Sequence, residues 1–350
     1  MPTPEFQIQF LTNLQRLLSE GSFVSTYKYA LLMSLADIAI EKGNDNNQPL
    51  QISTNIIAEK FIEYYWRQST PFLGEAEDLT ILRQNTGRQA GIIRVLNDSR
   101  LKHQGSLVSA RLDSKSWKQL IATVDGFVRT MPLWKLQTVG GQNLEFLYDN
   151  IGKGSAISLK PGVTYCLRKH YSMVADLVKG AWARYVRRFN LDLLGEQADL
   201  SEFLFGSERA DLSVVVPVLR EVQHGDCFYC QRPLKGEIAH VDHFIPWSRY
   251  PVDLGHNFVL AHGSCNGKKS DRLAAANHLD RWVTNQLSLG KDLAAEFQSR
   301  GVVNDLQSSI QIASWAYRQT FDCRGLTWVR ADELQELPES WNSGLLQMLN

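Results

Sequence analysis

The sequence predicts a mainly α-helical fold in which a short segment of mixed strand and helix is inserted between helical N-terminal and C-terminal regions. Three observations support this. Apolar residues recur at a spacing of three and four through most of residues 1–200. Residues 221–275 are instead dense in Cys, His, Gly and Asn and contain only short apolar runs. Helical spacing returns over residues 276–350, which we expect to pack back on the body.

The N-terminal region contains a series of amphipathic and capped helices. "FLTNLQRLL" places its apolar residues on one helical stripe. "STYKYALLMSLADIAIEKG" starts at a capping Ser or Thr, stops at Gly43 and is apolar nearly all round, which predicts a buried central helix. "STNIIAEKFIEYYWRQ" is a further capped helix. From "GQNLEFLYDN" to "GVTYCLR", Tyr, Gly and Pro residues indicate a small hairpin or irregular connection.

A strong helix is predicted from about Lys169 to Asn190, with basic residues beside its apolar stripe and Arg168 near its start. One interpretation of these basic residues is an ordinary solvated face. The other is a strip that contacts nucleic-acid phosphates. The candidate contacts on this helix are Arg184, Arg187 and Arg188.

Bulk composition limits the class of protein. Hydrophobic residues make up 44% and charged residues 21% of the 350 residues, an ordinary globular balance. The chain lacks an apolar run of about 18 residues and a signal-peptide pattern at its start, so we expect a cytoplasmic protein with no membrane partner. The 37 basic and 37 acidic residues argue against a protein coated with nucleic acid, but they allow a local basic patch.

Two short motifs in the inserted segment have the spacing of metal ligands. "CFYC" places Cys227 and Cys230 in one knuckle, and "HGSC" places His262 and Cys265 in a second knuckle with the same spacing. Two such knuckles can direct four ligand atoms to one ion, and three thiolates with one imidazole favour structural Zn²⁺. A chance pair or a redox motif is the alternative, but "QRPLKGE" after Cys230 indicates a turn and not a helix. Cys166 and Cys323 lack this spacing and are expected to be apolar fillers.

The order of elements between the knuckles is strand, loop, strand and helix. "HVDHFIPWS" and "HNFVLAH" are the two predicted strands, and a helix begins near Cys265. Strand alternation puts Asp242 and His243 on opposite faces, so both can serve one site only if the strand ends or twists there. Pro246 is consistent with an early end to the strand.

These residues resemble the HNH endonucleases, the ββα-metal nucleases, and in particular their zinc-stapled members. The matching positions run from the first knuckle through "VDHFIP" and "NFVLAHGSCNGKK". The resemblance covers residues 221–275 and implies a small zinc-stapled ββα-metal (HNH) domain within the mainly α chain. His262 stands where a third zinc cysteine is usual, and imidazole is a competent substitute.

The resemblance implies a role for each motif residue. His243 would be the general base, since an imidazole can accept a proton from water near neutral pH. Asn257 would be structural and would bridge the loop between the strands. Asp242 and Asn266 would hold a catalytic ion, and two oxygen ligands suit Mg²⁺ or Mn²⁺. Asn266 stands where many relatives have histidine, which makes this an H-N-N variant. Lys268 and Lys269 complete the candidate nucleic-acid contacts.

The function implied by the resemblance is metal-dependent hydrolysis of DNA, with one strand nicked per active site. RNA stays open as a substrate, as do a homodimer and a partner protein for the helical arms. Restriction or phage defence is an analogy at the level of the family. A non-catalytic zinc-stabilised nucleic-acid-binding module is the alternative, and it predicts loss of a base or ligand that is in fact present. A zinc deaminase is disfavoured because the H-x-E and P-C-x-x-C signature is missing.

Overall fold

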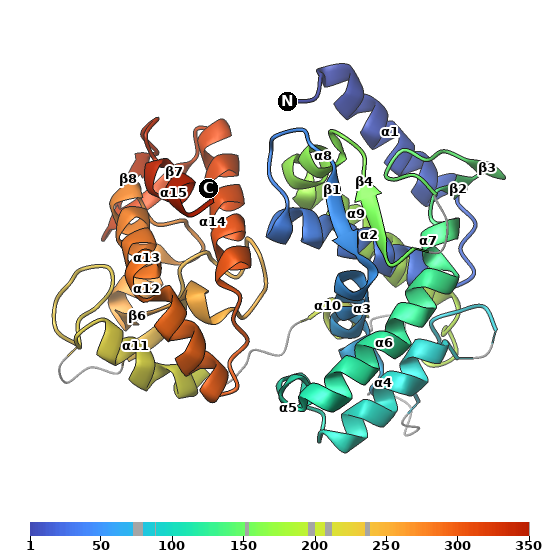
Figure 1. Cartoon of the computed structure of the whole chain (residues 1–350), viewed down its shortest axis with the longest axis horizontal. Coiled ribbons are helices and arrows are strands. Elements are labelled where there is room, and N and C mark those ends of the chain that lie inside the picture. Colours follow the sequence, from blue (N-terminus) through green and yellow to red (C-terminus); the bar gives the residue numbers. More distant parts are fainter. Residues whose placement is uncertain are drawn as a thin grey trace. The chain divides into compact units, whose positions relative to one another are not determined.

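The computed structural model describes residues 1–72, 80–87, 89–150, 154–194, 200–206, 212–234 and 239–349. The chain forms two compact units, Met1–Gly206 and Ser207–Asn350, coloured blue to green and yellow to red in Figure 1. Within the described residues the fold is mainly helical, and its four small sheets have two strands each. The mainly α fold is confirmed. Residues 276–350, predicted as a region of their own, belong to the same unit as the inserted segment.

The first unit is built around a central helix. Its helices are α1 (Pro4–Glu20), α2 (Tyr27–Lys42), α3 (Thr54–Gln68), α4 (Gly91–Lys102), α5 (Leu107–Leu112), α6 (Ser114–Thr130), α7 (Pro132–Lys135), α8 (Val163–Lys169), α9 (Tyr171–Arg188) and α10 (Leu200–Phe205). Helix α2 is buried along nearly its whole length and packs against α3, α8 and α9 (Figure 1). The apolar character of α2 on every face predicted this position, because such a helix must be covered all round.

Two short sheets complete the first unit. Strands β2 (Thr138–Val139) and β3 (Gln142–Asn143) form a tight hairpin that begins before residues 141–168, where a hairpin or irregular connection was expected. Strand β4 (Ala156–Leu159) pairs antiparallel with the distant β1 (Leu50–Ser53), with Leu50 opposite Leu159. Ser53 ends β1 and caps α3 by accepting a hydrogen bond from the Asn55 backbone N–H. Sequence patterns do not specify such a long-range pairing.

Arg168 has a structural role that the sequence did not indicate. Its guanidinium is buried and donates hydrogen bonds to the backbone carbonyls of Ala39, Ile40 and Gly43, at 3.0–3.1 Å. These carbonyls lie at the end of α2, where a helix leaves its last carbonyls without intrahelical partners, although the Ala39 carbonyl also accepts from the Gly43 N–H. Arg168 therefore caps the end of α2. The prediction that it lies with the basic residues of a surface strip is wrong.

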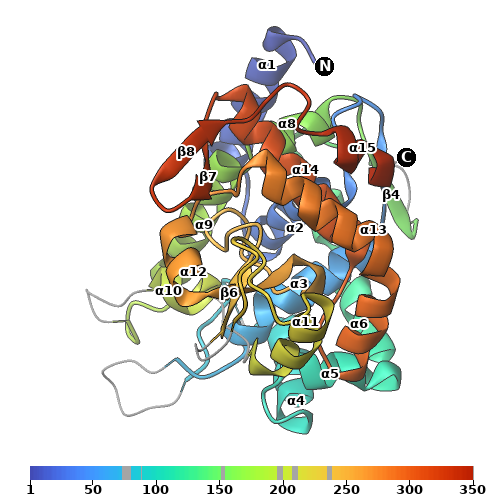
Figure 2. The same cartoon turned by 90° about the vertical axis from the view of Figure 1, so that its left-hand side faces the viewer.

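The second unit contains the inserted segment and the C-terminal helices. Its elements are η1 (Leu212–Val215), α11 (Val216–Val222), β5 (Ala239–His243), η2 (Gly255–Asn257), β6 (Phe258–His262), α12 (Gly263–Lys269), α13 (Ala276–Ser299), α14 (Leu306–Asp322), β7 (Leu326–Arg330), β8 (Glu333–Glu336) and α15 (Ser343–Leu349). Strands β5 and β6 pair antiparallel, with His243 opposite Phe258. Helix α12 packs against this hairpin, which gives the expected ββα order (Figure 2).

Aromatic side chains join the ββα segment to the C-terminal helices. Phe244, which follows β5, stacks on Trp282 of α13 with ring centroids 5.2 Å apart, and on Tyr317 of α14 at 6.2 Å. Trp328 of β7 meets Tyr229 of the first knuckle edge-to-face at 5.2 Å. A segment this short buries little apolar surface by itself. Helices α13 and α14 therefore contribute aromatic residues to its core.

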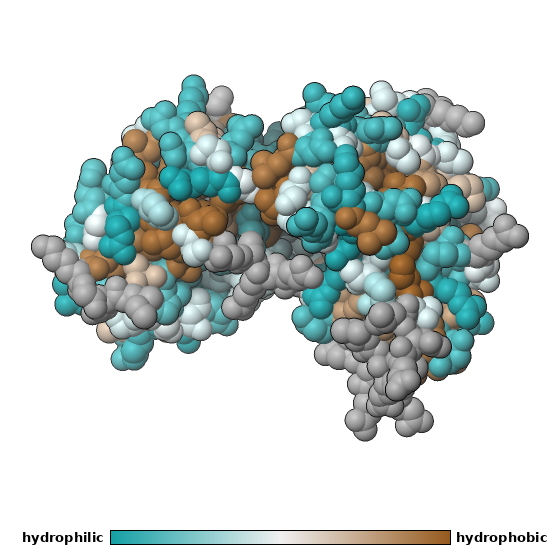
Figure 3. Space-filling model, turned by 90° about the horizontal axis from the view of Figure 1, so that it is seen from below, coloured by the Kyte–Doolittle hydropathy of each residue, from teal (hydrophilic) through white to brown (hydrophobic). Residues whose placement is uncertain are grey.

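Figure 3 shows hydrophilic side chains over much of one face, with apolar residues between them. Such a mixed surface is ordinary for a globular chain. Across the described residues, no helix combines the length and the apolar character needed to cross a membrane.

Candidate functional site

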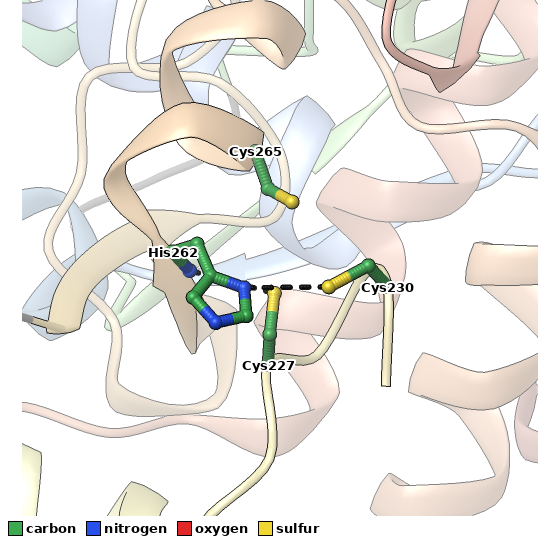
Figure 4. Close-up of side chains that lie close together, drawn as sticks. All are labelled: Cys227, Cys230, His262 and Cys265. Carbon is green, nitrogen blue, oxygen red and sulfur yellow. Dashed lines mark hydrogen bonds between the residues drawn. The ribbon is translucent and has the colours of Figure 1, made fainter. Parts of the chain in front are cut away.

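The two predicted knuckles meet in one cluster of ligand atoms. The Sγ atoms of Cys227, Cys230 and Cys265 and a ring nitrogen of His262 all lie within 4.8 Å of one another (Figure 4). A tetrahedral Zn²⁺ site with Zn–S bonds of about 2.3 Å would separate its sulfur atoms by about 3.8 Å. The cluster has both the donor set and the spacing for such an ion. Cys166 is buried as expected, whereas Cys323 is exposed, so its expected role as an apolar filler is wrong.

Backbone hydrogen bonds hold the first knuckle against the second strand. The Phe228 N–H donates to the carbonyl of Leu260 in β6 at 2.9 Å. The Gln231 N–H donates to the carbonyl of Cys227 at 2.9 Å, which closes the turn. Arg281 of α13 donates through Nη1 to the carbonyl of Phe228 at 2.6 Å. The knuckle is thus fixed by β6 and by α13 before any ion binds.

The orientation of the His262 ring is consistent with a place among the ligands of the cluster. Its Nδ1 lies 3.3 Å from Cys230 Sγ, and its Nε2 lies 3.2 Å from the carbonyl oxygen of Pro233. A carbonyl only accepts, so Nε2 carries the proton and Nδ1 offers its lone pair to the cluster. This is the usual way in which a second hydrogen bond sets the tautomer of a metal-binding histidine.

The thiols of Cys230 and Cys265 have pKa values that move in opposite directions. Burial acts to raise the pKa of Cys230, but hydrogen bonds from the backbone and side chain of Arg232 and from Cys227 lower it to about 6. Burial and the neighbouring thiols raise the pKa of Cys265 to about 12. Thiolates packed this closely repel one another, and a bound cation would relieve that repulsion.

His243 lies at the last position of β5, so the strand ends where the sequence required it to end. Its ring Nε2 lies 2.7 Å from Oδ1 of Asp253, a residue that the sequence analysis did not single out. The rings of Trp247 and Phe258 meet the imidazole edge-to-face, each with centroids 5.1 Å away. The His243 side chain is 15% exposed. The candidate base is therefore held on several sides and keeps limited access to solvent.

Asp242 points away from solvent and is engaged by two groups. Its Oδ2 lies 3.0 Å from Nζ of Lys269 and accepts a hydrogen bond from the Tyr229 hydroxyl at 2.5 Å. Lys269 also donates to the carbonyl of His243 at 2.9 Å, and its side chain has no exposed surface. The prediction that Lys269 contacts nucleic acid is wrong, because its ammonium is buried in an internal ion pair with Asp242. Burial lowers the pKa of Lys269, while Asp242 acts to raise it.

Asn257 bridges the loop between the strands. Its Oδ1 accepts from the backbone N–H of Ile245 at 2.7 Å, and its Nδ2 donates to the carbonyl of the same residue at 3.0 Å. Its own carbonyl accepts from the Phe244 N–H at 2.7 Å. This is the geometry that the sequence analysis assigned to Asn257. It sets the direction in which the chain leaves β5, directly after His243.

The remaining predicted residues fall into two groups. Asn266 lies half-buried on α12, and α12 packs against β5. Its role as an ion ligand stays a prediction. Lys268 is exposed and pairs with Asp332 at 2.6 Å. On α9, Arg184 and Arg188 are exposed and Arg187 is half-buried. Their contact with nucleic acid also stays a prediction.

Two further histidines, His240 and His256, lie in the same segment as His243. His240 is exposed on β5, and its ring lies against Gly263. His256 is buried, its Nε2 bonds to the carbonyl of Gly290 at 2.9 Å, and its ring meets Phe297 edge-to-face. Burial lowers the pKa of His256.

Comparison with known protein families agrees with this geometry. Residues 227–272 match the family model of the HNH endonucleases, so this part of the chain is an HNH domain and indicates a nuclease-type function. Residues 7–133 match a family described only as a domain of unknown function, DUF8808. No curated protein and no solved structure matches the chain.

Proposed function

We propose, from the HNH domain at residues 227–272, that this chain is a metal-dependent endonuclease that hydrolyses DNA phosphodiester bonds, one strand per active site. The observation that carries the proposal is the placement of His243. His243 ends β5, and its ring contacts the Asp253 carboxylate and two aromatic rings. Its side chain remains partly exposed to solvent. An imidazole so placed can serve as a general base.

In the proposed reaction His243 takes a proton from a water molecule. The water oxygen forms a bond to the scissile phosphorus as the bond from phosphorus to the 3′ oxygen breaks. The 3′ oxygen leaves with the electron pair and takes a proton from solvent. The products are a 5′ phosphate and a 3′ hydroxyl. Fixing the base before the substrate arrives removes part of the entropic cost of the step.

Asp242 and Asn266 are the proposed ligands of a catalytic Mg²⁺ or Mn²⁺. Such an ion, when bound, would neutralise charge on the phosphate and on the leaving oxygen. The Lys269 and Tyr229 contacts hold Oδ2 of Asp242, so the other carboxylate oxygen, Oδ1, is the proposed ligand of the ion. These contacts fix the carboxylate before the ion arrives.

The four residues of the Cys/His cluster are the proposed holders of a structural Zn²⁺. They join the first knuckle to the junction of β6 and α12. That junction carries Asn266, so an ion bound there would set the position of α12 relative to β5. The staple would therefore support the catalytic residues without entering the reaction.

Nucleic acid is the substrate class that an HNH domain implies, and the finer assignments are proposals. Arg184, Arg187, Arg188 and Lys268 are the proposed phosphate contacts. We assign DNA as the substrate, with RNA as the competing outcome of the assay. Restriction or phage defence is the proposed biological role, and the first unit is the proposed site of recognition, dimerisation or partner binding.

The proposal is tested by incubating zinc-loaded protein with supercoiled plasmid and with RNA, in Mg²⁺ and in Mn²⁺. Wild type should nick the plasmid, and His243→Ala should slow nicking by about 10²–10⁴-fold. Asp242→Ala and Asn266→Ala should be slower and also need more metal, with circular dichroism confirming that Asp242→Ala, which leaves Lys269 buried without its carboxylate, is folded. His240→Ala, a matched change on the same strand, should cut like wild type. Binding of DNA without cleavage in any of these metals would favour the non-catalytic nucleic-acid-binding module instead.

A further inference from the structure

The side chain of Asp253 has no role in any assignment made so far, yet it makes a close contact with the proposed base. We infer that Asp253 is a positioning residue that keeps the proton of His243 on Nε2 and leaves Nδ1 as the atom that accepts the proton from water. This inference rests on the proposed function, since it concerns the geometry of the same site. The separation of 2.7 Å between Nε2 and Asp253 Oδ1 is its starting point.

The chemistry of the pair decides which nitrogen is the base. A carboxylate only accepts hydrogen bonds, so a neutral imidazole that bonds to it must present its N–H there. The lone pair of the ring is then on Nδ1. When Nδ1 takes a proton, the ring becomes a cation and its bond to Asp253 becomes an ion pair. Asp253 therefore stabilises the protonated product of the step as well as the orientation of the neutral ring.

The surroundings of the pair make this bond stronger than a surface contact. The side chains of His243 and Asp253 are 15% and 22% exposed. Shielding from water lowers the local dielectric and strengthens a hydrogen bond. The edges of Trp247 and Phe258 limit rotation of the ring, which would otherwise exchange the two nitrogens. The imidazole has two orientations, related by a flip that exchanges its nitrogens. Asp253 favours the one with Nε2 toward its carboxylate, and the aromatic neighbours then hold the ring there.

The loop that carries Asp253 is anchored on both sides. Before it, the Arg249 N–H donates to the carbonyl of Pro246 and the Val252 N–H to that of Tyr250, both at 2.9 Å. After it, the Gly255 N–H donates to the carbonyl of Val303 at 2.9 Å. A Cβ at Gly255 would lie 2.4 Å from the ring of Phe297, so only glycine permits this approach. The carboxylate therefore reaches His243 from a fixed backbone.

The contact between Asp253 and His243 is the one expected for a base and the group that orients it.

The inference is tested first without cleavage, on the zinc-loaded full chain with ¹⁵N-labelled histidine. Long-range ¹H–¹⁵N spectra show which ring nitrogen carries the proton, and the signals of His243 are identified by their loss in His243→Ala. Wild type should show the proton on Nε2. Asp253→Ala should show a mixture of tautomers or a shift toward Nδ1–H, and Asp253→Glu should restore the wild-type pattern at least in part. Asp292→Ala, which changes an exposed carboxylate on α13, should leave the spectrum unchanged.

The second test is plasmid cleavage by the same variants. Asp253→Ala should lower kcat by about 10–100-fold, with KM little changed, because the base is misaligned while DNA contacts remain. In the His243→Ala background the same change should have no further effect, since Asp253 acts only through the histidine. Zinc content and circular dichroism confirm that each variant is folded, and Asp253→Asn provides a closer isostere if the alanine variant is not.

The outcomes separate the two proposals. An unchanged tautomer and an unchanged kcat in folded Asp253→Ala would overturn the positioning role while the nuclease assignment stands. A shifted tautomer in a protein whose wild type cuts neither DNA nor RNA would overturn the proposed function while the pairing stands. An equal loss of rate on adding Asp253→Ala to His243→Ala would show that Asp253 acts by another route.

Discussion

Two adjacent lysines of α12 offer a matched test of the internal ion pair. Lys269 has no exposed side-chain surface and lies 3.0 Å from the buried carboxylate of Asp242. Lys268 is 54% exposed and pairs with Asp332, which is 84% exposed. The two residues share the helix, the charge and the length of side chain. They differ in burial, so the substitutions Lys269→Ala and Lys268→Ala isolate the effect of burial.

The two substitutions should lower the free energy of unfolding by different amounts, because only Lys269→Ala leaves a charged partner buried. Lys269→Ala leaves Asp242 buried without its cation, which costs about 3–5 kcal/mol of unfolding free energy. Lys268→Ala breaks a pair that water already screens, and such pairs contribute about 0–1 kcal/mol. The gap of at least about 2 kcal/mol corresponds to a factor of about 30 in the unfolding equilibrium.

The assay is urea denaturation of the zinc-loaded protein, followed through zinc release to a coloured chelator. This signal reports on the second unit, which holds the cluster, and avoids averaging over a chain of two units. The double variant Asp242→Asn/Lys269→Met should recover much of the loss, since no charge then remains buried. Equal stability of Lys269→Ala and Lys268→Ala would refute the reasoning, as would a double variant no more stable than Lys269→Ala.

Three further predictions concern the staple, the basic helix and the first unit. Metal analysis should find about one tightly held zinc per chain, lost in Cys230→Ser with aggregation of the second unit; soluble, zinc-free, active wild type would contradict this. Replacing Arg184, Arg187 and Arg188 by alanine should flatten the log–log salt dependence of DNA binding by about 0.9 per lost contact, and an unchanged slope would return α9 to an ordinary solvated face. Burial raises the pKa of Asp37 from 3.8 to about 6, so between these values the folded chain holds a proton that the unfolded chain releases. The free energy of unfolding of wild type relative to Asp37→Asn should therefore fall as pH rises from about 4 to about 6, by at most about 3 kcal/mol, and urea titrations that show a flat difference would contradict the assignment.

Local patterns in the sequence predicted a large part of this protein. The apolar character of α2 on every face predicted its burial, and the spacing of the two knuckles predicted the Cys/His cluster. The order of strand, loop, strand and helix predicted the ββα arrangement around His243 and Asn257. These features depend on neighbours within a few residues along the chain, where periodicity and spacing carry the information.

The contacts that tune the site were decided only by the tertiary structure. Lys268 and Lys269 are indistinguishable as sequence letters, yet one meets solvent and the other is sealed against Asp242, because the packing of α12 on β5 leaves only one of them a path to water. Asp253 stands ten residues after His243 with no pattern to mark it, and it meets the imidazole only because the intervening loop folds back. The one sequence signal for Asp253 is chemical, since a histidine that acts as a base needs a group to orient it. The sequence by itself determined which chemical groups are present and how the local elements form. The free energy of burying a charge or aligning a ring depends on atoms brought from distant parts of the chain, so the burial of Lys269 and the pairing of His243 with Asp253 could be settled only by the folded packing.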